Sequence, residues 1–234
     1  MRIALLVAVC MAMVFAAHSA LLAQSFVSVW SDTGMDFGVA PAWFGNTGLV
    51  LTPSAFVSGP SKGTISYHWL DTDEDATDLA NLNVGVAAGV EIGGSWIDGP
   101  SGDSELVGNA KWRLPVDKWL AQEDLPAVAI GGVDITDELD RRLYVVLSKT
   151  MPVGMDESRM IGVHLGYGDS DAGILNGFFG GVTFGAFRNS VINAEYDGDN
   201  FNADLRWGLR DRLTLDVGVL DGDFGIGLTY GAGK

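Results

Sequence analysis

The sequence predicts an all-β protein: an antiparallel, up-and-down transmembrane β-barrel of about twelve strands, in a single domain after a signal peptide. Hydrophobic and polar residues alternate with a period of two, as in strands with one apolar and one polar face. The chain begins with an export-type segment, and charges of both signs share the polar face of single strands. These features favour a barrel with an apolar wall and a polar lumen in the bacterial outer membrane.

Residues 1–23 are expected to be a signal peptide. A basic residue precedes the apolar run 3–17, and the small residues after it favour cleavage near Ser19 or Ala23. The alternative is an uncleaved anchor helix, because the apolar stretch nearly reaches the length that spans a bilayer. Cys10 lies within this segment, so the mature chain is expected to hold no disulfide.

Two regions follow the signal peptide, an entry segment at 24–61 and the barrel at 62–231. The entry segment shows no sustained period, although residues 49–51 are expected to form a short apolar strand that Pro53 ends. The net charge of −16 excludes a nucleic-acid surface, which needs a basic patch. The expected partners are outer-membrane lipid and the machinery that inserts barrels.

The strands of the barrel are expected from residue 62 onward. In 201–207 one face carries Phe, Ala, Leu and Trp and the other carries Asn, Asp and Arg. Residues 115–125 break the pattern and are expected to hold one helical turn. The expected strands are 64–70, 82–88, 90–97, 106–114, 126–135, 142–149, 159–167, 177–187, 190–196, 201–207, 213–219 and 224–230.

Alternation alone does not decide which face points outward. A soluble sandwich turns its apolar face inward, whereas a membrane barrel turns it toward lipid. Glu105, Lys111 and Arg113 share one face of a single strand, and a soluble core could not bury three unpaired charges. The alternative is a secreted or periplasmic β-sandwich that binds carbohydrate. In the barrel, the predicted lumen-facing polar residues are His68, Glu91, Glu105, Lys111, Arg113, His164, Glu195, Asp204, Arg206 and Asp216.

The connections between strands sort by charge. One rim receives more than half of the acidic residues and the other rim receives both chain ends. In outer-membrane barrels the rim with the chain ends is periplasmic, so the acidic rim is expected outside, where it attracts cations and repels anions. A polysaccharide or divalent cations are expected partners there, although Asp-Gly pairs are also simply good turn formers. The acids that mark this rim are Asp71, Asp73, Asp75, Asp197, Asp199, Asp221 and Asp223.

No catalytic residue, metal site or cofactor is predicted. Residues 71–75 begin like a calcium loop, but Ala76 and Leu82 stand where glycine and a bidentate glutamate are needed. His68 and His164 are the histidines of the mature chain and no cysteine accompanies them, which argues against zinc. No compact nucleophile motif surrounds His164, so a barrel hydrolase that uses it is the weakest alternative.

Several runs resemble one family. Residues 45–55, Gly-Asn-Thr-Gly-Leu-Val-Leu-Thr-Pro-Ser-Ala, resemble the G-x-T-G-L-x-x-T-P-[TS]-A opening of the YjbH-like (YbjH) outer-membrane proteins. Residues 125–135 resemble that family's L-P-A-x-A-x-G-x-x-D-[IF] strand, and 195–200 and 220–225 fit its later hairpins. The resemblance implies an outer-membrane β-barrel with a part in the export or assembly of surface exopolysaccharide. It supplies no catalytic residue.

Overall fold

The computed structural model describes residues 40–72, 76–99, 104–120, 125–153, 159–170, 173–187, 189–210 and 212–232. The predicted signal peptide and the first part of the entry segment lie outside these residues, as do Asp73 and Asp75. Within the described ranges, no helix is long and apolar enough to cross a membrane.

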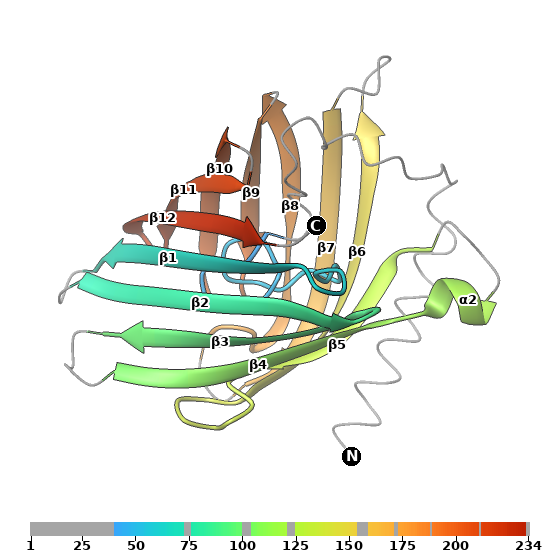
Figure 1. Cartoon of the computed structure of the whole chain (residues 1–234), viewed down its shortest axis with the longest axis horizontal. Coiled ribbons are helices and arrows are strands. Elements are labelled where there is room, and N and C mark those ends of the chain that lie inside the picture. Colours follow the sequence, from blue (N-terminus) through green and yellow to red (C-terminus); the bar gives the residue numbers. More distant parts are fainter. Residues whose placement is uncertain are drawn as a thin grey trace.

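Twelve antiparallel strands close into one barrel (Figure 1). Each strand pairs with its neighbours in sequence, and β12 pairs with β1 to close the wall. The predicted all-β, up-and-down barrel of twelve strands is confirmed, and the two-sheet sandwich is wrong because the single sheet closes on itself. The elements are β1 (Gly63–Asp71), β2 (Ala76–Ala87), β3 (Val90–Asp98), β4 (Ser104–Leu114), α2 (Val116–Leu120), β5 (Ala127–Val133), β6 (Arg142–Val153), β7 (Arg159–Asp169), β8 (Gly177–Phe187), β9 (Ser190–Tyr196), β10 (Phe201–Arg210), β11 (Leu213–Leu220) and β12 (Asp223–Ala232).

The apolar face of the strands points outward. In β10, Phe201 and Trp207 are exposed whereas Asp204 and Arg206 are buried, so exposure alternates along the strand. Residues that pair directly on neighbouring strands point their side chains to the same face of the wall. Leu215 pairs with Trp207 on one side and with Leu228 on the other, and all three point outward. A side chain of this outer face therefore meets other outer side chains around the wall, and polar side chains meet inside.

The lumen is filled by residues 40–61, which we call the lumen segment. Figure 1 shows it in blue within the ring of strands. It forms isolated bridges, between Pro41 and Thr47 and between Gly48 and Pro53, instead of a strand. The predicted strand at 49–51 is therefore wrong. The side chain of Glu195, and not a neighbouring strand, accepts the backbone N–H groups of Val50, Leu51 and Thr52.

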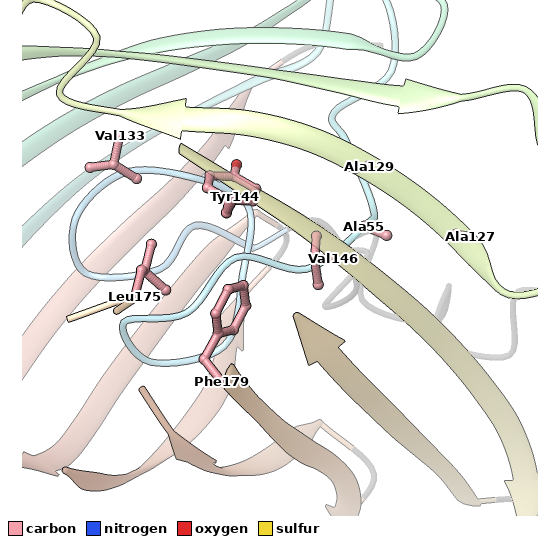
Figure 2. Packing of buried hydrophobic residues seen from close by; sticks show 8 residues of the cluster. All are labelled: Ala55, Ala127, Ala129, Val133, Tyr144, Val146, Leu175 and Phe179. Atoms are coloured by element: carbon pink, nitrogen blue, oxygen red, sulfur yellow. The ribbon is translucent and has the colours of Figure 1, made fainter. Parts of the chain in front are cut away.

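Two apolar clusters pack the lumen segment against opposite parts of the wall. Ala55 packs in one cluster with wall residues that include Tyr144 and Phe179 (Figure 2). Trp43, Val50 and Leu51 pack in the other. Burial of such side chains stabilises the fold by roughly 1.5–3 kcal/mol each. The second cluster also contains Leu79 and Leu220.

Glycines in the wall make room for the lumen segment. A Cβ atom at Gly225 would lie 2.4 Å from the ring of Trp43, and one at Gly181 would lie 2.6 Å from Leu49. Both distances are far inside van der Waals contact, so a larger residue would displace the lumen segment or the wall. At these two positions the lumen segment therefore requires glycine in the wall.

Candidate functional site

Glu195 binds the centre of the lumen segment. The alternation of β9 points it inward, where it is 3% exposed. Its carboxylate accepts hydrogen bonds from the backbone N–H groups of Val50 (3.0 Å), Leu51 (2.6 Å) and Thr52 (3.2 Å), and from the Thr52 hydroxyl (2.7 Å). An ionised acceptor makes stronger hydrogen bonds than a neutral one. One carboxylate therefore fixes a turn of three successive residues.

Glu91 and Lys111 bind Thr47 from both sides. They are direct neighbours on β3 and β4, with 3.6 Å between the ammonium and a carboxylate oxygen. Lys111 donates to the carbonyl of Thr47 (2.7 Å), and Glu91 accepts from the N–H (3.0 Å) and hydroxyl of the same residue. Glu91 also accepts from the N–H of Ser58 (2.9 Å). The pair thus joins two distant parts of the lumen segment.

Arg206 holds the turn between these two anchors. Its guanidinium donates to the carbonyl oxygens of Gly48 (2.9 Å) and Leu49. The same group pairs with Asp204 (3.2 Å) and Asp216 (3.3 Å), and all three side chains are at most 3% exposed. A buried charge is tolerated when it is paired and hydrogen-bonded, and this cluster meets that condition.

The two predicted lumen histidines also contact the lumen segment. His68 stacks on Trp43, with 4.6 Å between ring centroids, and lies 3.6 Å from Asp216. His164 shares a 2.8 Å hydrogen bond with Ser148, whose hydroxyl accepts the N–H of Ala55 (2.8 Å). Ser148 and His164 are buried residues of the wall. The hydrogen bond from Ala55 to Ser148 connects this pair to the lumen segment.

Eight of the ten predicted lumen residues are buried, and the other two lie at the ends of β4. Glu105 is half-buried and Arg113 is exposed. Both lie on the inner face, but the lumen segment does not cover the strand ends. The predicted lumen-facing set omits Asn81, which donates to the carbonyl of Trp43, and Ser95 and Asn109, which donate to that of Phe44. All three residues occupy inward-facing positions in the alternation of their strands, and this alternation indicates that they face the lumen.

One rim carries the connections β1–β2, β3–β4, β5–β6, β7–β8, β9–β10 and β11–β12, and we call it the acidic rim. Asp71, Asp199 and Asp221 are exposed there and Asp223 is half-buried. Asp197 is not an exposed rim charge, because it is 1% exposed and accepts from the N–H groups of Asp199 and Asn200. No group of three or more His, Cys, Asp or Glu in the described part of the chain is placed to hold a metal ion.

The β5–β6 connection on this rim is organised by Asp134. Its carboxylate accepts from the N–H groups of Glu138 (3.1 Å), Leu139 (2.7 Å) and Asp140 (2.8 Å), and from the Thr136 hydroxyl (3.0 Å). Burial raises the pKa of Asp134, but these hydrogen bonds outweigh burial and hold the pKa below its usual value. Asp134 therefore acts as an ionised turn former in this loop.

No protein-family model matches the chain, and no curated protein matches it either. The resemblance of residues 45–55 to the YjbH-like opening motif remains a prediction.

Glu195→Gln is expected to loosen the lumen segment. The amide turns an NH₂ group toward backbone N–H donors, so part of a charge-assisted network worth about 1.5–3 kcal/mol is lost. Chymotrypsin cleavage after Phe44 and Phe56 should accelerate about tenfold or more, as measured on gels and by mass spectrometry. Glu105→Gln is the matched control, since Glu105 lies on the same inner face near a rim. Equal cleavage rates in the two variants would contradict the anchoring role.

Proposed function

We propose that this chain is an outer-membrane β-barrel of the bacterial envelope, closed at rest by its own lumen segment. Its role is in the export or assembly of surface exopolysaccharide, by transport or as a scaffold and without catalysis. The observation that carries the membrane location is the outer wall, which is apolar around the closed sheet. The polysaccharide role rests on the resemblance of residues 45–55 to the YjbH-like family.

The outer wall has the composition of a lipid-facing surface. Along β12 the exposed side chains are Phe224, Ile226, Leu228 and Tyr230, with an aromatic ring at each end and aliphatic groups between. The ten residues of β12 extend about 33 Å, and at the usual strand tilt of about 40° they span about 25 Å, the height of the apolar band on outer-membrane barrels. Aromatic rings at both edges favour the two membrane interfaces. In water, so continuous an apolar surface would promote aggregation.

The orientation follows from the topology. β1 begins and β12 ends at the rim opposite the acidic rim, and we call it the terminal rim. In outer-membrane barrels the rim with the chain ends faces the periplasm. The acidic rim would then face outside, where it repels an anionic polymer. A neutral polymer, bridging divalent ions or an accessory role each avoids that repulsion.

The lumen segment bears directly on the type of function. The stretch 45–55 that resembles the family motif contains residues that Glu91, Lys111, Glu195 and Arg206 bind. A lumen filled in this way supports an accessory barrel, or a channel that opens only when the segment moves. It does not support a permanently open pore.

Leu228→Arg is expected to test the membrane location. An arginine on the lipid face near mid-membrane lowers the free energy of unfolding by roughly 2–4 kcal/mol. The measurement is urea unfolding of the vesicle-inserted protein, with heat-modifiable gel mobility as the measure of the folded fraction. Leu228→Phe is the control, because it keeps an apolar side chain at the same position. If both variants unfold at the same urea concentration, the outer wall does not face lipid.

Planar-bilayer recordings test whether the lumen segment closes the barrel. The wild type is expected to be almost silent, and Arg206→Gln is expected to open more often because the carbonyl groups of Gly48 and Leu49 lose their charged donor. Arg210→Gln, an exposed arginine at the end of the same strand, should behave like the wild type. Steady conductance of the wild type would show that the segment does not close the lumen.

Deletion of the gene tests the polysaccharide role. Cells that lack the protein should carry or release less exopolysaccharide, measured as total sugar in the surface and culture fractions. A plasmid copy of the wild-type gene should restore the amount. Unchanged polysaccharide in the deletion strain would remove this role while leaving the membrane barrel intact.

A further inference from the structure

The end of β4 and the start of β5 lie at nearly the same level of the terminal rim, where Leu114 pairs with Val128. The last residue of β6 that pairs with β5 is Ser148. β6 continues to Val153 and keeps its pairing with β7, whereas its ladder with β5 ends at Ser148. α2 lies in the connection between β4 and β5, and Figure 1 shows it beside β5. Because β4 also ends at this level, β6 and β7 extend past both strands and leave a step in the terminal rim.

A cavity of about 270 Å³ lies at this step of the rim. Arg113 and Ser148 reach it from the inner face, together with Phe56 of the lumen segment. Leu114 and Val116 line it as well, and Leu114 belongs to the outer face because it follows Arg113 on β4. The cavity thus touches the lumen on one side and the outer wall on the other.

The charged groups of this cavity suit a zwitterionic ligand. Arg113 is exposed, unlike the buried Lys111 and Arg206 of the lumen, and its planar guanidinium can bind two oxygens of a phosphate. Asp117 of α2 is exposed and lines the same cavity, where its carboxylate can accept from an ammonium group. Lys149 also lines the cavity and adds positive charge near the phosphate position.

The remaining surroundings are those of a membrane interface. Leu114, Val116 and Leu125 give the cavity an apolar side. Trp112 and Trp119 flank it in sequence and are 44% and 61% exposed, as is usual for residues at the headgroup level. A ligand that joins a charged head to an apolar tail would match both sides of the cavity.

We propose that this cavity binds the headgroup of an ethanolamine phospholipid. The phosphate lies on Arg113 and the ammonium lies on Asp117, while the acyl chains run along Leu114 and Val116 to the outer wall. The volume holds a headgroup and leaves the chains outside. The inference rests on the proposed membrane location, since the lipid comes from the leaflet at the terminal rim.

Lipid binding is measured by native mass spectrometry of the purified protein in detergent, with dihexanoyl-phosphatidylethanolamine as the probe. Arg113→Gln should weaken binding roughly tenfold or more, because it removes the charged donor and keeps the side-chain length. Asp117→Asn should weaken it by a smaller factor. Arg210→Gln is the matched control, an exposed arginine on the same rim, and should bind like the wild type. Equal affinity in all variants would overturn the site.

Two further probes separate the sources of the same chemistry. Dihexanoyl-phosphatidylglycerol lacks the ammonium and should bind more weakly, so equal or tighter binding would overturn the ethanolamine headgroup. Free phosphoethanolamine should also bind more weakly, and equal affinity would overturn the lipid assignment. Each variant is first checked for heat-modifiable mobility in vesicles. If the wild type shows no heat-modifiable mobility, the proposed membrane location itself is wrong. If all variants fold as barrels but lipid binding does not depend on Arg113, only the lipid site is wrong.

Discussion

The hydrogen bonds between Glu195 and the backbone of residues 50–52 are the interaction on which the rest of the lumen depends. Buried backbone N–H groups need acceptors, and the lumen segment forms no strand that would supply them. One carboxylate supplies acceptors for three of these groups at once. Without it, the polypeptide that fills the lumen would carry unsatisfied donors into a space with little water.

The dependence between wall and lumen segment is mutual. Glu195, Arg206 and Lys111 are buried only because the lumen segment covers them, and a buried charge without a partner is strongly destabilising. The carbonyl and N–H groups of the segment provide those partners. Neither part is satisfied alone, so the charges specify one position for the segment where purely apolar packing would allow several.

The sequence predicted the wall well and the lumen poorly, for a physical reason. The wall obeys a local rule, because each strand alternates between outward apolar and inward polar side chains, and so most strand ranges and the helical turn at 115–125 were readable. β2 is the exception, since it begins at Ala76, six residues before its predicted start. The lumen segment depends on contacts such as that of Glu195 with Val50, 145 residues apart, which no local pattern encodes. Asp197 was taken for a surface charge because its N–H partners become visible only when the turn is folded. The alternation along β3 and β4 predicts that Glu91 and Lys111 face inward, but it does not predict that both contact Thr47.

The position of the lumen segment in the chain has a consequence for folding. The segment precedes β1, yet its anchors lie on β3, β4, β9 and β10, with sequence separations that reach 158 residues. Contacts between such distant residues form late, because a long loop must close first. The segment therefore cannot complete its hydrogen bonds until most of the wall is assembled. Residues 40–61 are synthesised before their partners on β9 and β10, so the filling of the lumen follows the assembly of those strands.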